Sequence, residues 1–299
     1  MPKRLCALLR ARGIPFEENV SMADRTTLRV GGPADVLVEA TGAEAIAEAF
    51  AVARETDTPV LVIGNGSNLL VKDTGLRGLT VVIGSGMEAV RQEGNTLHAQ
   101  AGTLLGRVAQ IAQRAGLSGL EGLSGIPGTV GGAVCMNAGA YGAEMAQRVV
   151  SVKTISRFGE TEELSNASLA FGYRHSAVMD RQLSVTDVTF RLTPAPPEEI
   201  AAMMREYAGK RREKQPLTLP SAGSFFKRPV GHFAGALIEQ ASLKGVSVGG
   251  AQVSEKHGGF LVNTGGATAQ DFLDLMELIQ ARVYENSGVR LEPEVQILG

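Results

Sequence analysis

The chain has 299 residues, of which 44% are hydrophobic and 20% are charged, so it is long enough to form two domains with sizeable cores. Its formal net charge of −2 offers no basic field for nucleic acid or an anionic membrane, which leaves a small molecule as the expected partner. The only cysteines, Cys6 and Cys135, lie outside any C-x-x-C pair. This argues against a disulfide framework, a cysteine zinc site or dithiol redox chemistry, and we expect a cytoplasmic protein.

The chain begins with a segment, residues 3–10, that predicts a short amphipathic helix ending at Gly13 and Pro15. Arg10 and Arg12 interrupt its apolar run and no small-residue cleavage site follows, so a signal peptide is not expected. No other stretch approaches the roughly 18 uninterrupted apolar residues of a membrane helix.

The middle of the chain predicts short strands with single helices between them. Strands are expected at 35–40, 59–63, 79–83, 96–101, 149–156 and 183–192. Thr41 and Glu44 form a capping-box pattern before a helix over 45–55, and a helix over 103–115 is expected to end at Gly116. This arrangement indicates an α+β domain rather than a regular doubly wound sheet.

A proline-rich segment at 194–197 marks the expected domain boundary. The elements expected after it are helices over 198–212 and 234–241, a long helix between Thr268 and Gly288, and strands at 224–227, near 252, at 260–263 and at 291–298. We therefore predict a lead-in at 1–23, a domain at 24–194 with subdomains at about 24–84 and 85–194, and a domain at 195–299.

Two glycine-rich loops, Gly64 to Asn68 and Gly125 to Gly132, carry the strongest functional signal. Glycine tolerates positive φ and lets a ligand approach the backbone N–H groups, so such loops at strand ends can hold a phosphate. Two of them predict one diphosphate held from both sides. For the first loop alone, an ordinary tight loop is the alternative.

A dinucleotide fingerprint, G-x-G-x-x-A, also occurs at Gly84 to Ala89 after an expected strand. The turn at residues 93–95 follows too soon for the long helix whose N-terminus would hold a pyrophosphate. The context therefore argues against a Rossmann domain.

A series of motifs, in order along nearly the whole chain, resembles the UDP-N-acetylenolpyruvoylglucosamine reductase family. They begin at Thr27-Leu28-Arg29-Val30-Gly31-Gly32-Pro33-Ala34, Ile63-Gly64-Asn65-Gly66-Ser67-Asn68-Leu69-Leu70, Gly125-Ile126-Pro127-Gly128-Thr129-Val130-Gly131-Gly132-Ala133 and Asn137-Ala138-Gly139-Ala140-Tyr141-Gly142. They continue at Gly172-Tyr173-Arg174-His175-Ser176, Pro220-Ser221-Ala222-Gly223-Ser224-Phe225-Phe226-Lys227-Arg228-Pro229, Gly249-Gly250-Ala251-Gln252-Val253-Ser254 and Leu291-Glu292-Pro293-Glu294-Val295.

The resemblance implies an FAD-binding fold of the vanillyl-alcohol-oxidase type, with two α+β subdomains that hold FAD without a covalent bond. A third, C-terminal α+β domain covers the substrate. Neither glycine loop contains a His or Cys that could attach to the flavin. The interval between Arg174 and Ser224 looks like that of the shorter enzyme form, which lacks an inserted substrate-covering tyrosine; Tyr207 lies in this interval on an expected helix, and the role is not transferred to it.

The FAD-binding residues implied by the matching motifs are Arg29, Gly31, Gly32, Gly64, Asn65, Gly66, Ser67, Asn68, Leu69, Gly125, Ile126, Pro127, Gly128, Thr129, Gly131, Gly132 and Ala133. The implied reaction starts with reduction of FAD by NADPH and departure of NADP⁺. The flavin then delivers hydride to an enolpyruvyl ether, which makes UDP-N-acetylmuramate for peptidoglycan.

The implied catalytic residues are Arg174, Ser224 and Glu294. Ser224 would donate the proton, because an enolate-like carbon is basic enough to take it from a hydroxyl held within hydrogen-bond reach. Arg174 would stabilise the charge that develops on the substrate carboxylate, and Glu294 would orient that group or share a proton with it. From the residues alone, a serine that caps a strand turn is the favoured interpretation of Ser224, Arg174 could pair with Asp180, and Glu294 could be a solvated strand residue.

Further residues have weaker assignments. The resemblance suggests Tyr173, Lys227 and Gln252 as substrate contacts. The basic run at 210–214 could meet a pyrophosphate, but such residues also complement the dipole at a helix C-terminus. The four histidines have no metal-ligand spacing, so no metal is expected. We expect a monomer or weak oligomer.

Two other functions compete with the reductase. Ser224 to Lys227 is formally S-x-x-K, the motif of acyl-transferring serines, but the S-D-N element is missing and the two phenylalanines suggest a strand where that motif needs a helix. A flavin-binding module without catalysis would explain the glycine loops. It would leave the motifs of Arg174, Ser224 and Glu294 without a purpose.

Overall fold

The computed structural model describes residues 2–299, which pack as two compact units. Unit 1 contains residues up to Glu18, Val36–Asn65 and Gly78–Gly209, and unit 2 contains Asn19–Asp35, Gly66–Arg77 and Lys210–Gly299. The units part inside helix α6 (Pro197–Lys214). The predicted domains at 1–23, 24–194 and 195–299 divide the chain by function and stay a prediction.

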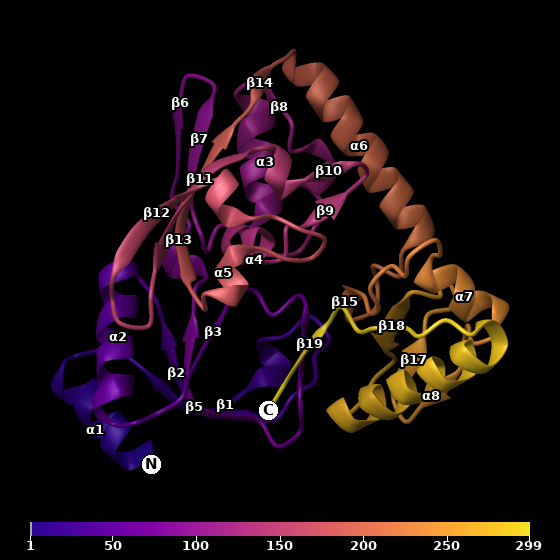
Figure 1. Ribbon diagram of the computed structural model, residues 1–299, viewed down its shortest axis with the longest axis horizontal. Helices are drawn as coiled ribbons and strands as arrows, with labels where there is room; N and C mark the ends of the chain where they lie inside the picture. Colours follow the sequence, from indigo (N-terminus) through magenta and orange to yellow (C-terminus); the bar gives the residue numbers. More distant parts are fainter. Residues whose placement is uncertain (1) are drawn as a thin grey trace. The chain divides into compact units, whose positions relative to one another are not determined.

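Unit 1 contains a five-stranded antiparallel sheet in the order β12-β11-β13-β7-β6 (Figure 1). Its strands are β12 (Thr161–Ser165), β11 (Val149–Ile155), β13 (Ser184–Arg191), β7 (Thr96–Gln100) and β6 (Val90–Glu93). Helix α4 (Val130–Cys135) contacts both β13 and β7, and buried side chains of all three elements belong to the same core. The sheet therefore supports the helix that follows the second glycine loop.

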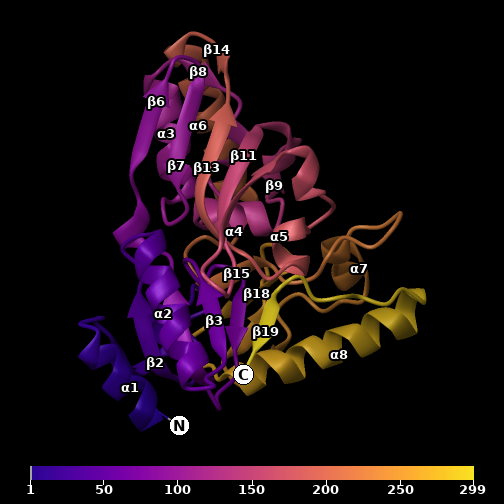
Figure 2. The same cartoon turned by 60° about the vertical axis from the view of Figure 1, so that its left-hand side comes forward.

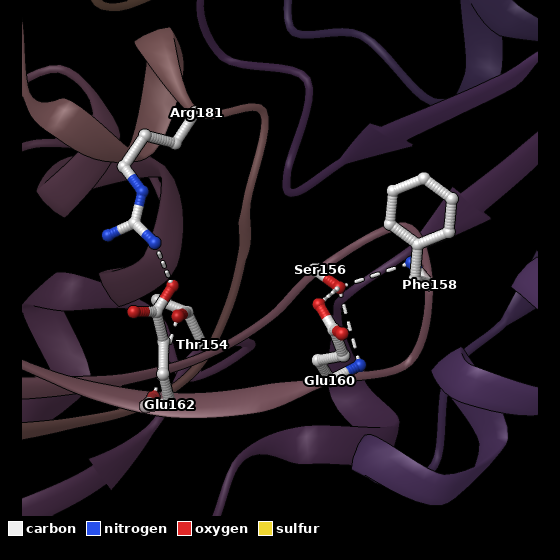
Figure 3. A network of polar contacts seen from close by, with 6 residues as sticks. All are labelled: Thr154, Ser156, Phe158, Glu160, Glu162 and Arg181. Atoms are coloured by element: carbon white, nitrogen blue, oxygen red, sulfur yellow. Dashed lines mark hydrogen bonds and ion pairs between the residues drawn. The ribbon is translucent and has the colours of Figure 1, made fainter.

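The hairpin between β11 and β12 closes through the side chain of Ser156 (Figure 3). Its oxygen accepts from the N–H groups of Phe158 at 3.2 Å and Glu160 at 3.3 Å, and its hydroxyl lies 3.4 Å from the Glu160 carboxylate. Farther along β12, Glu162 is bound by Arg181, which follows α5 (Ala177–Asp180). The contacts of Ser156 stabilise the turn of this hairpin, and the contact of Arg181 connects β12 with the end of α5.

A second sheet has the order β1-β2-β5-β3. It consists of β1 (Glu17–Ser21), β2 (Pro33–Glu39), β5 (Leu76–Val82) and β3 (Val60–Ile63), with β3 parallel to β5. The crossover between β2 and β3 contains α2 (Ala43–Glu55), and α1 (Pro2–Ala11) packs on α2 (Figure 2). The first glycine loop starts where β3 ends.

Unit 2 is built on a four-stranded sheet in the order β15-β18-β17-β16, antiparallel throughout. The strands are β15 (Ser221–Ser224), β18 (Phe260–Asn263), β17 (Ala251–Val253) and β16 (Ser247–Val248). Helix α8 (Ala269–Ser287) contacts β16, β17 and α7 (Ala234–Gln240) (Figure 1). Its apolar stripe is buried, with Phe272 stacked on Phe225 at 6.3 Å between ring centroids.

The remaining elements are short. They are α3 (Leu105–Arg114), the strands β4 (Leu69–Val71), β8 (Leu117–Ser118), β9 (Gly139–Ala140), β10 (Ala143–Glu144), β14 (Thr193–Pro194) and β19 (Gln296–Leu298), and the 3-10 turns η1 (Met22–Asp24), η2 (Ser85–Met87), η3 (Glu121–Leu123), η4 (Met145–Gln147) and η5 (Ala167–Leu169). Within residues 2–299, every helix is too short or too polar to cross a lipid bilayer.

Three local predictions were wrong. The capping box of Thr41 and Glu44 does not form, because α2 begins after Gly42 and has no side-chain cap. The strand expected at 224–227 ends at Ser224, and Phe226 pairs only through an isolated bridge to Pro293. That proline has no N–H to donate, and the strand expected at 291–298 is confined to β19. The long helix with its cap at Thr268 and Asp271 and its end at Gly288 is confirmed.

Candidate active site and cofactor loops

The two glycine loops touch each other in unit 1. The side-chain amide of Asn65 donates to the carbonyl of Pro127 at 2.6 Å. A Cβ atom on Gly64 would lie 2.4 Å from Oγ1 of Thr129, so only glycine allows this approach. Thr129 is the N-cap of α4, and its Oγ1 accepts from the N–H of Gly132 at 3.4 Å. The first loop therefore packs against the cap of the helix that follows the second.

The loops differ in the backbone donors that they offer to a ligand. Among residues 2–299, none of the N–H groups from Gly64 to Asn68 donates to an acceptor in the protein. At the start of α4, by contrast, Val130 donates to the carbonyl of Thr103 and Gly131 to that of Ala101, both at 2.8 Å. An anion thus finds more available donors in the first loop, and the two loops do not contribute alike.

In unit 2, the end of the first loop packs against the Thr27 to Gly32 motif. Gly66 has a φ of 62°, and a Cβ there would lie 2.1 Å from the carbonyl oxygen of Arg25. Its own carbonyl accepts from the N–H of Thr27 at 3.3 Å. A Cβ on Gly32 would lie 2.0 Å from the carbonyl oxygen of Asp73. Glycine is therefore required at both positions by close backbone packing.

Two buried hydroxyls near these loops have no hydrogen-bond partner in the protein. They are Oγ1 of Thr27 in unit 2 and Oγ1 of Thr103 in unit 1. A buried hydroxyl without a partner is costly, so each is suited to a polar ligand. The Thr103 hydroxyl in unit 1 and the Thr27 hydroxyl in unit 2 each fit a polar group of a cofactor. Arg29, which is exposed and has a φ of 55°, adds a cation in unit 2.

Arg174 lies on a tight turn of unit 1. Gly172 and His175 pair as an isolated bridge, with the N–H of Gly172 donating to the carbonyl of His175 at 3.0 Å, so Tyr173 and Arg174 form the tip. Arg174 has a φ of 56°, which costs a residue with a side chain roughly 1–2 kcal/mol. Its guanidinium carbon lies 5.0 Å from the centre of the exposed Tyr173 ring. The carboxylate of Asp180, considered above as its partner, lies 2.8 Å from Nε2 of His175.

The residue that holds this turn is Asn137, to which the sequence analysis assigned no role. Its buried amide donates to the carbonyl of Gly172 at 3.0 Å and to the Glu144 carboxylate at 3.2 Å. Its Oδ1 accepts from the N–H of Ala146 at 3.0 Å, and its own φ is 40°. Asparagine is one of the few residues that adopt this backbone conformation readily, and this was the signal available in the sequence.

In unit 2, Ser224 and Glu294 are brought together by backbone hydrogen bonds. The N–H of Phe225 donates to the carbonyl of Gly259 at 2.8 Å, and the N–H of Glu294 donates to the carbonyl of Phe225 at 2.9 Å. Ser224 is exposed, and its hydroxyl has no hydrogen-bond partner among residues 2–299. Its proton is therefore available to a ligand.

Glu294 is less exposed than the nearby Glu292. Glu294 is half-buried, whereas Glu292 is exposed and lies 3.4 Å from Nζ of Lys227. Lys227 is bound to the same residue by its backbone, because its N–H donates to the Glu292 carbonyl at 2.8 Å. The amide of Gln252 donates to the carbonyl of Gly245 at 3.2 Å. Of the three candidate substrate contacts, Lys227 and Gln252 thus have partners within unit 2.

The acyl-transfer alternative needs Ser224 to open a helix. Instead Ser224 ends strand β15, and the two phenylalanines that follow it are buried in the core of unit 2.

Burial raises the pKa of the Cys135 thiol to about 11 and that of Cys6 above its ordinary value, so neither is a thiolate at neutral pH. Residues 2–299 contain no group of three or more His, Cys, Asp or Glu side chains placed to hold a metal ion.

Comparison with known proteins gives consistent matches along the chain. Residues 34–165 match the family model "FAD binding domain", which includes both glycine loops, and residues 215–298 match "UDP-N-acetylenolpyruvoylglucosamine reductase, C-terminal domain". The UDP-N-acetylenolpyruvoylglucosamine reductase of Lactococcus lactis subsp. cremoris is 48% identical over 94% of both chains, and that of Pediococcus pentosaceus is 47% identical over 94% of both.

Solved structures support the same relationship. The UDP-N-acetylenolpyruvylglucosamine reductase of Thermus caldophilus superposes with a TM-score of 0.83 at 40% identity, over 96% of this chain and all of the other. The Physcomitrella patens protein BBE-like 1 shares only 18% identity and has a TM-score of 0.50 over 64% of this chain and 44% of its own. This second likeness concerns the fold alone. The predicted α+β fold of the FAD-binding type is confirmed.

Proposed function

Because this chain belongs to the UDP-N-acetylenolpyruvoylglucosamine reductase family, we propose that it is an FAD-containing oxidoreductase that uses NADPH to reduce UDP-N-acetylglucosamine enolpyruvate to UDP-N-acetylmuramate, a peptidoglycan precursor. The reaction adds a hydride to the terminal carbon of the enolpyruvyl double bond and a proton to the adjacent carbon. When bound, FAD would supply the hydride chemistry that connects NADPH with the substrate. The chain itself must bind both molecules, stabilise charge and supply the proton.

The chain holds FAD non-covalently, through the backbone donors and hydroxyls near the glycine loops. The N–H groups from Gly64 to Asn68, which have no acceptor among residues 2–299, would bind phosphate oxygens, and the partnerless hydroxyls of Thr27 and Thr103 would each bind a polar cofactor group. Gly131 and Gly132 would contribute close backbone approach rather than N–H donors. In this proposal, residues 24–194 hold FAD and residues 195–299 bind the substrate.

The three proposed catalytic residues divide the remaining tasks. Arg174 carries a permanent planar cation that would stabilise charge delocalised into the substrate carboxylate. Ser224 would donate the proton to the carbon beside that carboxylate, since its hydroxyl is exposed and has no competing acceptor in residues 2–299. Glu294 would orient the carboxylate end of the substrate. Tyr173, Lys227 and Gln252 are proposed substrate contacts.

The observation that carries the proton-donor role is the pair of backbone hydrogen bonds around Phe225, which fixes Ser224 beside Glu294 while leaving its hydroxyl unbonded. The test separates the two half-reactions by anaerobic stopped-flow absorbance. Ser224→Ala is expected to leave flavin reduction by NADPH within about twofold and to slow reoxidation by the enolpyruvyl sugar by about 100-fold or more, the usual contribution of a general acid. The matched control is Ser221→Ala, on the same strand. Equal slowing of both half-reactions by Ser224→Ala would contradict the role.

A flavin-binding module without catalysis makes a different prediction in the same experiment. Its bound flavin would be yellow and reducible, yet the enolpyruvyl sugar would not reoxidise it anaerobically. An acyl-transferring enzyme would be colourless as purified. Colour, bleaching by NADPH and substrate-dependent return of the yellow form therefore separate the three functions.

We also propose a cytoplasmic location and a monomeric or weakly associating state. The two free cysteines, neither of which pairs with the other, are compatible with a reducing compartment. Sedimentation equilibrium over a 100-fold range of concentration would detect a stable oligomer and contradict the second part of this proposal.

A further inference from the structure

A histidine that the proposed chemistry does not use lies just before β18, the strand that pairs with the strand of Ser224. His257 belongs to the loop between β17 and β18, and Nδ1 of its ring accepts from the N–H of Gly259 at 3.1 Å. The loop begins with a second local contact, because the Ser254 hydroxyl oxygen accepts from the N–H groups of Lys256 at 3.2 Å and His257 at 3.4 Å. The imidazole therefore accepts a hydrogen bond from a backbone N–H group of its own loop.

The ring is held in a slot formed by glycines and one aromatic side chain. A Cβ on Gly235 of α7 would lie 3.2 Å from Cε1 of the imidazole, and a Cβ on Gly259 would lie 3.1 Å from the same atom. The ring of Phe260 meets the imidazole edge to face, with 5.0 Å between ring centroids. Larger residues at the two glycines would displace the ring, so its position is closely defined.

Two connections lead from this ring to Ser224. The carbonyl of Gly259, whose N–H is bound by His257, accepts from the N–H of Phe225 at 2.8 Å. Phe260, which contacts the imidazole, is the cross-strand partner of Ser224 in the pairing of β15 with β18. The same Phe225 peptide segment then accepts from the N–H of Glu294 at 2.9 Å. All of these residues belong to unit 2.

We propose that His257 is a positioning residue for proton transfer: its neutral imidazole, by accepting from Gly259, fixes the loop that sets the backbone of Phe225 and with it the hydroxyl of Ser224. The inference rests on the proposed role of Ser224. A proton on Nδ1 turns the acceptor into a donor that faces the Gly259 N–H, so this hydrogen bond is lost when the ring is charged. Delivery of the proton to the substrate then slows in acid, whereas reduction of the flavin by NADPH does not.

The surroundings of the ring favour its neutral form. Desolvation by burial is the main cause that lowers the pKa of His257 below its ordinary 6.5. A hydrogen bond to the backbone of His257 itself raises the pKa, whereas the positive charge of Lys244 lowers it further. The carboxylate of Glu239 on α7 opposes this, but it lies 3.2 Å from Nζ of Lys244. The flanking side chains of its own loop, Glu255 and Lys256, are exposed. The hydrogen bond is therefore retained at neutral pH and lost as the pH falls below 6.5.

The test measures both half-reactions of the FAD-loaded enzyme as a function of pH in wild type, His257→Asn and His257→Ala. The wild-type rate of reoxidation is expected to fall on an acid limb with a midpoint below 6.5, while the rate of reduction does not follow that limb. In His257→Asn, Oδ1 can take the place of Nδ1 as an acceptor that does not titrate, so the limb disappears and most of the rate at about pH 8 remains. His257→Ala is expected to slow reoxidation about tenfold at all pH values, the scale of one lost hydrogen bond that positions a reacting group. His232→Asn, an exposed histidine of the same unit, is the control and keeps the wild-type profile.

A spectroscopic readout tests the hydrogen bond without catalysis. Long-range proton–nitrogen NMR of the histidines is expected to show the tautomer of His257 with its proton on Nε2, titrating below 6.5. The inference is overturned by a proton on Nδ1 at about pH 8, by an acid limb that persists in His257→Asn, or by equal slowing of both half-reactions in His257→Ala. If Ser224→Ala leaves reoxidation unchanged, the proposed function of Ser224 fails. If Ser224→Ala slows reoxidation and His257→Ala does not, only the role of His257 fails.

Discussion

The contact between the two glycine loops can be tested with a single added methyl group. In Gly64→Ala the new Cβ would lie 2.4 Å from Oγ1 of Thr129 and 3.5 Å from its Cβ. An ordinary contact needs about 3.5 Å, so the oxygen must move by about 1 Å or the loops must separate. If the Thr129 side chain rotates away, Gly132 loses its cap acceptor, which costs about 0.5–2 kcal/mol. We therefore expect Gly64→Ala to destabilise the protein by about 1–2 kcal/mol and to weaken FAD binding about tenfold or more.

A double-mutant cycle isolates this contact from general effects of the substitution. Thr129→Ala removes the oxygen and alone costs about 1 kcal/mol, the loss of an N-cap. With the oxygen gone, the methyl group at residue 64 meets nothing closer than 3.5 Å. The double variant should therefore be no less stable than Thr129→Ala alone, which corresponds to a coupling energy of about 1 kcal/mol or more.

The assay combines thermal unfolding of the apoprotein with titration of flavin fluorescence to obtain the Kd of FAD. For a chain of this size, 1 kcal/mol corresponds to a Tm shift of about 2–4 °C. Gly209→Ala is the control, because a Cβ at this helical position in α6 has no neighbour within 4 Å. Additive effects of Gly64→Ala and Thr129→Ala in both assays would refute the claim that the loops meet through this pair.

Two further predictions concern residues that hold the site and its fold. Asn137→Ala leaves the Gly172 carbonyl and the Ala146 N–H without their partner, so we expect the free energy of unfolding in urea to fall by about 2 kcal/mol or more. Reoxidation of the flavin should also slow, because the turn that carries Arg174 loosens. An unchanged urea midpoint would contradict this prediction. Asp271 caps α8, and the N–H of Thr268 is the main cause that lowers the pKa of this carboxyl below 3.8. The contribution of the Asp271 carboxylate to stability is therefore fully present above pH 3.8 and is lost as the pH falls below that value. We expect Asp271→Ala to lower the free energy of unfolding by about 1 kcal/mol, and this difference from wild type should narrow only in strong acid. Urea unfolding at several pH values measures it.

The longer helices of this fold follow from local patterns in the sequence, whereas the short helices α4 and α5, the cap of α2 and the ends of several strands do not. The apolar spacing of α8, its cap at Thr268 and its stop at Gly288 are all properties of neighbouring residues, and the helix forms as predicted. The end of β15 depends on a partner far along the chain, because Phe225 bonds to Gly259 and Glu294 instead of continuing the ladder. No local pattern contains that information.

In the candidate site, too, some features could be predicted from the local sequence and others could not. The glycine loops were identifiable because close backbone approach requires glycine at Gly64, Gly66 and Gly32. Which N–H groups are already used could not be predicted, since the acceptors of Val130 and Gly131 come from another strand end. The residue type of Asn137 indicated its backbone conformation but not its role, because the carbonyl that it binds is far along the chain.

The residues that support the proposed site and the residues proposed to act in it differ in how their polar atoms are hydrogen-bonded. The supporting side chains have their polar atoms bonded to backbone: Asn137 binds Gly172 and Ala146, and Nδ1 of His257 binds Gly259. The hydroxyls of Ser224 and Thr27 have no hydrogen-bond partner among residues 2–299. A weak acid such as serine gains nothing from a protein acceptor, which would stabilise its protonated state and compete with the substrate carbon for the proton. Fixing the backbone of Ser224 through Phe225, while leaving its hydroxyl unbonded, therefore gives precise placement without that competition.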